Sequence, residues 1–245
     1  MIVEDRFPAI LYKYLDAFGG LSMVKNEELW FTRPDNLNDP YDCYHVNTLK
    51  GDYDKFNVDF DVNTGSKSRG VCSLCDSPLK FRMWSYYNKH KGICVGINMN
   101  VVKEKLLGYH KDVMKFVTIR KVKYQSSIPR IDLYDLMPKD YLNSNEEAFD
   151  KAQNAIHDFL STKALWWSDE NEYRLLIREN EIPPTDDPAK VRVENLIDSV
   201  YIGCKYDEDI TAIIDLAKKR KFNVYKMGIK NDDFGLVFQE LYIRQ

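Results

Sequence analysis

The stretch that most constrains this chain is residues 165–177, where two tryptophans lead into an alternating segment. Its apolar side chains recur at every second position, at Tyr173, Leu175 and Ile177. That period predicts a strand with one face in the core. The same alternation puts Glu170, Glu172 and Arg174 on the opposite face, beside Trp166 and Trp167.

Glutamate is a poor strand former, so two glutamates on one strand face break a local rule, and such breaks often mark function. Glu170 and Glu172 are therefore predicted to act as catalytic carboxylates. The structural alternative is an edge strand whose charged face is solvated, with an Arg174–Glu ion pair, because ion-pair networks imitate active sites.

Composition narrows the class of protein. The chain has 245 residues, 44% of them hydrophobic and 30% charged, which is typical of a soluble globular protein. A net charge of −3 provides no global basic field for nucleic acid, although a local patch could bind it. No apolar run reaches the ~20 residues that span a bilayer, so no membrane association is expected. The absence of a signal-peptide pattern and the five irregularly spaced cysteines indicate a cytoplasmic protein with reduced thiols.

The periodicity along the chain predicts an α+β fold: one compact domain over residues 1–245, with a mixed or antiparallel central sheet and few helices. Gly19-Gly20 indicates a turn or the end of the first strand, and residues 50–70 indicate a mobile surface loop. Strands are expected near residues 10–15, 28–32, 70–75, 93–97, 113–124, 173–177, 200–203, 224–227 and 235–243, and helices near 83–91, 145–164 and 209–220.

A loop dense in Pro, Asn and Asp occupies residues 33–42. Asn38 and Asp39 precede Pro40, which restricts Asp39 to extended conformations. One interpretation is turn chemistry, in which these side chains bond to nearby backbone. The other is a rigid loop that presents Asn38, Asp39 and Asp42 to a cleft.

Several familiar motifs are absent or weak. Residues 72–75 form a CxxC, but on a strand its two cysteines would point to opposite faces, and no second pair lies at zinc spacing. No phosphate-binding loop, dinucleotide fingerprint, zinc-protease motif or nucleophile elbow is present. No metal site is therefore predicted.

A set of motifs resembles an uncharacterised bacterial family, one of the catalogued domains of unknown function. The matching segments are Tyr12-Lys13-Tyr14, Leu29-Trp30-Phe31, Asn38-Asp39-Pro40-Tyr41-Asp42, Ser73, Met83-Trp84-Ser85-Tyr86-Tyr87, His90-Lys91-Gly92-Ile93-Cys94 and Trp167-Ser168-Asp169-Glu170-Asn171-Glu172-Tyr173-Arg174. A departure lies at Cys72-Ser73-Leu74-Cys75, where the family has Ser-Phe-Ser, so a role for the second hydroxyl is in doubt. The family implies no settled activity.

The order of residue types also resembles the ADP-ribosyltransferase layout. In that layout a basic residue on an early strand holds the NAD ribose and nicotinamide, and a middle-strand Ser supports the pocket. The last Glu of a late Glu-x-Glu stabilises the ribosyl oxocarbenium ion and orients the acceptor. The analogous positions are Lys13, Ser73, Glu172 and, for the acceptor, Glu170. Lys13 departs from the usual Arg or His, since an ammonium lacks the forked geometry of a guanidinium.

This resemblance implies a nucleotide or NAD as ligand, with NAD a candidate substrate and no tightly bound cofactor. The residues predicted to bind it are Tyr12, Tyr14, Ser73, Trp84, Tyr87 and Arg174, beside the catalytic Lys13, Glu170 and Glu172.

Three functions stay open. The first is an NAD-dependent transferase of the ADP-ribosyltransferase kind, in a bacterial toxin or phage-defence setting. The second is a metal-dependent nuclease that uses Asp39, Asp42, Glu170 and Glu172 as ligands. The third is a non-enzymatic module that binds a ligand or partner, in which the charges form an internal ion-pair network.

Overall fold

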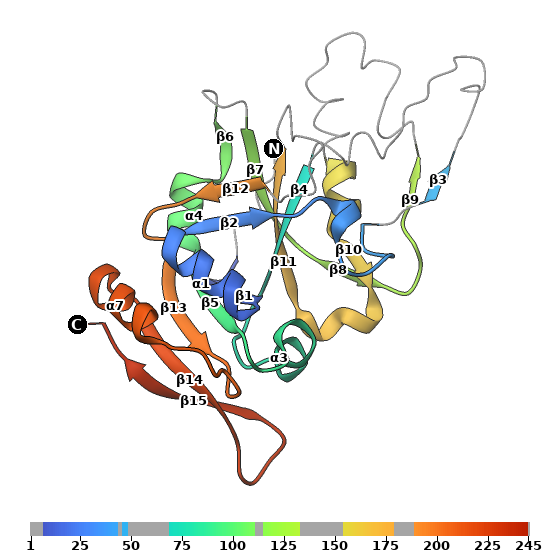
Figure 1. Ribbon diagram of the computed structural model, residues 1–245. Coiled ribbons are helices and arrows are strands. Elements are labelled where there is room, and N and C mark those ends of the chain that lie inside the picture. Colours follow the sequence, from blue (N-terminus) through green and yellow to red (C-terminus); the bar gives the residue numbers. More distant parts are fainter. Residues whose placement is uncertain are drawn as a thin grey trace.

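The computed structural model describes residues 7–43, 46–48, 69–110, 115–132, 154–178 and 189–244. Its centre is a nine-stranded sheet with the order β15-β14-β13-β5-β1-β4-β11-β7-β6 (Figure 1). Those strands are β1 (Ile10–Leu15), β4 (Arg69–Cys75), β5 (Ile93–Asn98), β6 (Gly108–His110), β7 (Lys115–Lys121), β11 (Glu172–Arg178), β13 (Ile197–Ile202), β14 (Asn223–Ile229) and β15 (Leu236–Tyr242).

The sheet is mixed. β13 and β14 are parallel, and helix α7 (Thr211–Arg220) connects them, as a parallel pair requires a crossover. The other pairings in this sheet are antiparallel. This architecture confirms the α+β prediction of one compact domain with a mixed central sheet and few helices.

Three short two-stranded sheets flank the central one. They pair β2 (Glu28–Phe31) with β12 (Ala189–Arg192), β8 (Lys123–Gln125) with β10 (Thr162–Ala164), and β3 (Val46–Thr48) with β9 (Arg130–Asp132). The remaining elements are helices α1 (Ala17–Asn26), α3 (Phe81–Asn88) and α4 (Met99–Lys105), the 3₁₀ turns η1 (Pro34–Asn36) and η5 (Leu165–Glu170), and a helical segment at residues 154–160.

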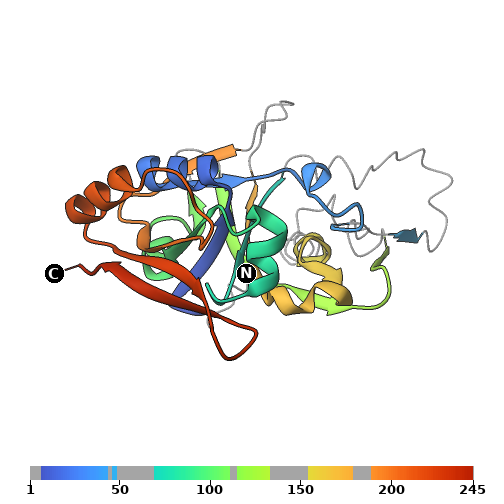
Figure 2. The ribbon, with the colours of Figure 1, turned by 60° about the horizontal axis from the view of Figure 1, so that its bottom comes forward.

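The two faces of the sheet carry different cores. One face packs Leu11, Val95 and Leu175 beneath α1 and α7, which lie side by side on one side of the sheet (Figure 2). The opposite face packs Tyr14 and Cys75 against Trp84 of α3. Glu172 and Arg174 belong to this second face.

The strand register fixes which side chains share that second face. Glu172 lies opposite Cys75, and Cys75 lies opposite Tyr12. Arg174 lies opposite Ser73. Because neighbouring residues on a strand alternate between faces, Lys13 belongs to the face of Leu11.

The sequence pattern does not predict helix α1, because Gly19-Gly20 indicates a turn or the end of the first strand. Asp16 caps this helix by accepting a hydrogen bond from the Gly19 N–H at 2.6 Å. A Cβ atom on Gly20 would lie 2.6 Å from Cβ of Ile93, so a glycine is required where the helix meets β5. Close helix–sheet packing, rather than a turn, explains this glycine.

Of the predicted mobile loop at 50–70, residues 50–68 lie outside the described part of the chain, and Arg69 and Gly70 belong to β4. Of the helix expected at 145–164, the residues before 154 lie outside the described part of the chain. The helix ends at residue 160, so its predicted end at 164 is wrong, because Thr162–Ala164 form strand β10. Within the described ranges, the helices are too short or too polar to cross a bilayer.

Candidate functional site

The 165–177 stretch does not run as one strand. Residues Leu165–Glu170 form a 3₁₀ turn, which ends at Asn171 in the left-handed conformation with φ 44°. Asparagine tolerates this conformation, and its side-chain amide donates a hydrogen bond to Asp76. The prediction that Glu170 lies on the strand is therefore wrong, since the strand begins at Glu172. The edge-strand alternative is also wrong, because β11 lies between β4 and β7.

Arg174 is fully buried and surrounded by acceptors. Its Nη2 atom lies 2.7 and 2.9 Å from the two carboxylate oxygens of Asp42. Its Nε donates to Oε1 of Glu172 at 2.7 Å, and Nη1 donates to the Leu160 carbonyl at 2.6 Å. The guanidinium thus ties the Pro-Asn-Asp loop to β11.

Lys163 brings the two glutamates together. Its ammonium lies 2.5 Å from Oε2 of Glu170, 3.1 Å from Oε2 of Glu172 and 3.7 Å from Oδ2 of Asp42. It also lies 5.2 Å from the centre of a Trp167 ring, which is a cation–π contact. Lys163 was not among the predicted site residues, because its position depends on the pairing of β10 with β8 and no local motif surrounds it. Asp42, Lys163, Glu170, Glu172 and Arg174 are called the buried ion network below.

Neighbouring hydroxyl groups complete the hydrogen bonding of this network. Tyr87 donates to Oε1 of Glu170 at 3.0 Å, and the hydroxyl oxygen of Tyr124 accepts the Glu172 N–H at 2.8 Å. The Ser73 side chain hydrogen-bonds to the Glu172 carboxylate. Buried charges need this degree of satisfaction, since each lost partner leaves a desolvated charge.

The two glutamates have opposite pKa shifts. Burial opposes ionisation of Glu172, but Arg174 and Lys163 outweigh it and lower the pKa of Glu172 to about 2. Burial raises the pKa of Glu170, with the charge of Glu172 adding to the rise and Lys163 opposing it. A raised carboxyl pKa beside an ionised carboxylate is a pattern found at acid–base sites.

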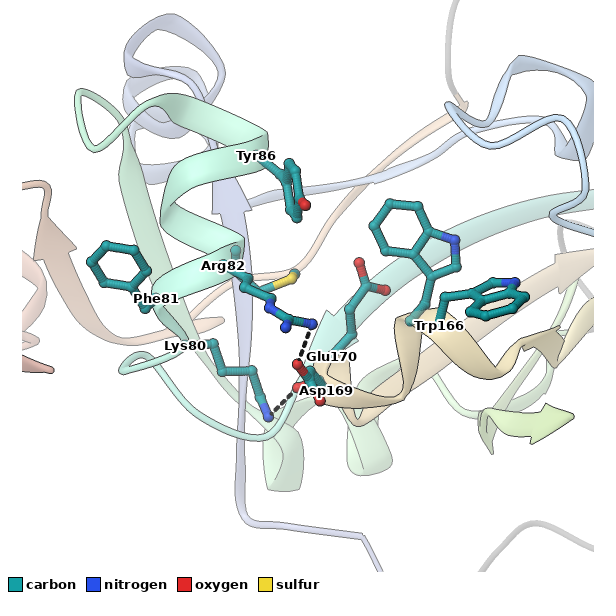
Figure 3. A pocket seen from close by; sticks show the side chains of 9 residues that line it. Lys80, Phe81, Arg82, Tyr86, Trp166, Asp169 and Glu170 are labelled. Atoms are coloured by element: carbon teal, nitrogen blue, oxygen red, sulfur yellow. Dashed lines mark hydrogen bonds and ion pairs between the residues drawn. The ribbon is translucent and has the colours of Figure 1, made fainter. Parts of the chain in front are cut away.

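A cleft of about 360 Å³ opens beside Glu170. It is lined by Lys80, Phe81, Arg82, Met83, Tyr86, Trp166, Trp167, Asp169 and Glu170. Figure 3 shows the Glu170 carboxylate between the α3 side chains and the tryptophans. Glu170 is the member of the buried ion network that lines this cleft.

Two cationic side chains, Lys80 and Arg82, line the wall of the cleft opposite the tryptophans. Lys80 donates to the Asp169 carbonyl at 2.8 Å and pairs with Asp76, and Arg82 lies 2.5 Å from the Asp169 carboxylate (Figure 3). Tyr14 and Trp84, which were predicted to bind a cofactor, are buried beneath this wall. Tyr14 donates to the Ser77 carbonyl and accepts from the Lys80 N–H, and Trp84 donates to the Pro78 carbonyl. Both side chains hold the loop that positions Lys80.

The three loop residues predicted to face a cleft, Asn38, Asp39 and Asp42, have different environments. Asp39 accepts the Tyr41 N–H at 2.9 Å through one oxygen and the Trp167 indole N–H at 2.6 Å through the other. Asp39 therefore combines turn chemistry with positioning of Trp167. Asn38 is exposed, whereas Asp42 is buried on Arg174.

The residues predicted on β1 do not line the cleft. Tyr12 packs edge-on against Tyr201, with ring centres 5.9 Å apart. Lys13 donates to the Ser73 carbonyl at 3.1 Å from the sheet face opposite Glu172. The remaining predicted residues, Ser73, Tyr87 and Arg174, surround the two glutamates.

In the part of the chain that is described, no three His, Cys, Asp or Glu side chains are arranged to hold a metal ion. Asp42 and Glu172 direct their oxygens at Arg174 and Lys163, and Asp39 is bonded to Trp167. Cys72 and Cys75 pack on opposite faces of the sheet, as their spacing predicts for a strand. Asp39, Asp42, Glu170 and Glu172, which the nuclease hypothesis assigns to a metal ion, are therefore bonded to protein groups in this structure.

Comparison with curated proteins found no match, and comparison with solved structures found none either. One family model does match, and the segment runs from the start of the Met-Trp-Ser motif through Arg174. The family is described as a protein of unknown function (DUF2971), its model covers residues 83–175 of this chain, and the resemblance to a domain of unknown function is thereby confirmed.

Proposed function

We propose that this protein is a nucleotide-handling transferase of the ADP-ribosyltransferase kind, with NAD as its substrate. The observation that carries the proposal is Glu170, a carboxylate with a raised pKa that lines a cleft of aromatic rings and cations. The 360 Å³ volume suits the nicotinamide–ribose end of a dinucleotide, with the rest of the molecule extending into solvent.

The cleft walls match the parts of a nucleotide. Tyr86 and Trp166 are 68% and 83% exposed, so their rings are accessible for stacking on a planar base. Arg82 and Asp169 form an exposed ion pair, which is worth only ~0–1 kcal/mol and can yield to a phosphate. Lys80 is a second candidate for the phosphate. In this proposal Lys80 and Arg82 supply the positive charge that the sequence analysis assigned to Lys13.

The proposed reaction transfers ADP-ribose from nicotinamide to an acceptor. The bond between the ribose C1′ atom and the nicotinamide nitrogen breaks, and the nitrogen keeps the electron pair, so nicotinamide leaves neutral. The acceptor forms the new bond to C1′ and loses a proton, which Glu170 accepts. Positive charge develops on the sugar during this exchange, and the Glu170 carboxylate stabilises it.

In this proposal the two glutamates have different roles. Glu172 carries no direct role toward the substrate, because it is not among the residues that line the cleft and its oxygens are bonded to Arg174, Lys163 and Ser73. It acts as a positioning residue, which holds Lys163 against Glu170.

The test is nicotinamide release from NAD, followed by chromatography, with and without protein, RNA and DNA acceptors. Glu170→Gln is expected to lower the rate at least ~100-fold, as loss of an acid–base group does. Glu194→Gln is the control, because Glu194 is an exposed side chain that lies 3.9 Å from Arg192. Intact NAD in every wild-type reaction, or equal rates for wild type and Glu170→Gln, would overturn the proposal.

A non-enzymatic binding module is the second candidate. It is favoured by the burial of the ion network, since Arg174 and Asp42 are bonded to protein groups and are not accessible to a ligand. On this alternative NAD or another nucleotide binds in the cleft and remains intact. Saturable NAD binding without nicotinamide release would select it. A bacterial toxin or phage-defence setting in the cytoplasm remains part of the first proposal.

A further inference from the structure

A second hollow, of about 250 Å³, shares Trp166 as a lining residue with the first cleft. Its walls come from the loop after β8, from β10 and from Tyr41, and they include Gln125, Ser127, Thr162 and Lys163. None of the described side chains that line it is a carboxylate. The first cleft, by contrast, contains Asp169 and Glu170.

The two hollows share a wall and a charge pair. Trp166 lines both, the first reaches Glu170, and the second reaches Lys163. The Lys163 ammonium and the Glu170 carboxylate are 2.5 Å apart. Two ligands, one in each hollow, would therefore share the Trp166 wall and lie beside the two members of one ion pair. A transfer between two substrates requires such a meeting point.

We propose that this second hollow binds the nucleobase of the acceptor, an inference that rests on the proposed transferase function. The rings of Tyr41 and Trp166 are 62% and 83% exposed and present surfaces on which a base can stack. The Gln125 amide, held by a 2.7 Å bond from Nε2 to the Ser127 carbonyl, can hydrogen-bond to the edge of a base. The exposed hydroxyls of Ser126 and Ser127 add further donors and acceptors.

Charge distinguishes this occupant from a protein side chain. An arginine or lysine acceptor would need a carboxylate in the hollow to pair with, and the described lining provides none. A neutral base, of a nucleic acid or of a free nucleotide, fits this lining, because the described walls contain no carboxylate and the Lys163 ammonium is already bonded to Glu170 and Glu172. In the proposed step a base nitrogen forms the bond to C1′, nicotinamide leaves with the electron pair, and the N–H proton passes to Glu170.

The experiment measures binding and does not depend on NAD turnover. Fluorescein-labelled single-stranded oligonucleotides of mixed sequence, DNA and RNA, are titrated with the full chain and followed by fluorescence polarisation. Ser127→Trp places a bulky ring in the hollow from an exposed loop position and is expected to weaken binding at least tenfold. Ala212→Trp introduces the same ring at an exposed position on α7 and is expected to leave binding unchanged.

Competition with unlabelled nucleosides and nucleoside monophosphates distinguishes the source of the base. Displacement by free nucleosides assigns the hollow to a free nucleotide acceptor, and displacement by oligonucleotide alone assigns it to nucleic acid. Both results support a base-binding hollow.

Equal affinity of wild type and Ser127→Trp for the oligonucleotides would overturn the inference, as would the absence of oligonucleotide and nucleoside binding. Preferential binding of an arginine-rich peptide that Ser127→Trp abolishes would also overturn it. NAD binding, titrated separately, is expected to be unchanged in Ser127→Trp. Failure of NAD cleavage with intact, Ser127→Trp-sensitive base binding would reject the transferase proposal while retaining the base-binding hollow.

Discussion

The buried ion network and the open cleft are adjacent, yet they use charge in different ways. Around Arg174 each charge is buried and bonded to protein partners. Across the cleft, Arg82 and Asp169 pair at the surface, with side chains 65% and 60% exposed. Only strong mutual pairing keeps charges buried in the first region, whereas the surface pair of the second can exchange partners with a ligand.

Glu170 belongs to both regions. The network contains three carboxylates, Asp42, Glu170 and Glu172, but two cations, Lys163 and Arg174. Asp42 and Glu172 each contact both cations, whereas Glu170 contacts Lys163, so we assign the surplus negative charge to Glu170, beside the cleft. The third carboxylate is not needed to balance the two buried cations. It would, however, stabilise a positive charge that develops on a substrate in the cleft.

The largest expected effect on stability is that of Arg174→Met. This variant leaves Asp42 and Glu172 buried without their guanidinium partner, and the free energy of unfolding should fall by ~3–5 kcal/mol. Urea denaturation measures it, with Arg192→Met as the control because the Arg192 side chain is 66% exposed. Similar losses for the two variants would show that the network is not the closed region described above.

The pH dependence of stability tests the contribution of Glu172 to the buried ion network. Because the pKa of Glu172 is lowered from 4.5 to about 2, its contribution is fully present above pH 4.5 and is lost as the pH falls toward 2. A shift of this size corresponds to up to ~3 kcal/mol. In urea denaturation from pH 6 to pH 3, the stability difference between wild type and Glu172→Gln should narrow as the pH falls. A constant difference would contradict the assigned shift.

Asp39→Ala tests the support of the cleft wall. It removes the 2.6 Å bond from the Trp167 indole, and the expected cost is ~1 kcal/mol together with weaker NAD binding. Asp35→Ala is the control, since Asp35 pairs with Arg33 at the surface and should change stability by less than ~0.5 kcal/mol. Unchanged NAD binding by Asp39→Ala would show that the position of Trp167 does not contribute to the ligand site.

The smallest effect on stability is expected for Trp166→Ala. The side chain is 83% exposed, so the free energy of unfolding should change by less than ~0.5 kcal/mol. Ligand binding should nevertheless weaken, because this ring lines both hollows. Phe234→Ala removes another fully exposed ring, between β14 and β15, and should leave binding unaffected. Equal binding by the two variants would contradict the role of Trp166.

Much of the sheet could be predicted from alternation, as Tyr173, Leu175 and Ile177 illustrate, because a buried strand face repeats every two residues. The place of Glu170 could not be predicted that way. A left-handed residue at Asn171 ends the 3₁₀ turn, and the side chain of Asn171 is bonded to Asp76, which is far away in sequence and could not be identified from a local pattern.

The site was predictable in part, for a related reason. Glu172, Arg174 and Ser73 are brought together by the pairing of β11 with β4, and Asp42 is added through its bonds to Arg174. Lys163 has no motif around it, and its position depends on β10 pairing with β8. Lys13 matched a pattern of residue order, but the register of β1 turns its side chain to the other face of the sheet.

The most direct test of the central claim compares the unfolding free energies of Glu170→Gln and Glu172→Gln at neutral pH. Glu170→Gln removes the surplus charge and leaves the remaining carboxylates matched with Lys163 and Arg174, so its change should stay within ~1 kcal/mol. Glu172→Gln removes the carboxylate that bridges both cations and should cost ~3 kcal/mol or more. A larger loss for Glu170→Gln than for Glu172→Gln would contradict the account.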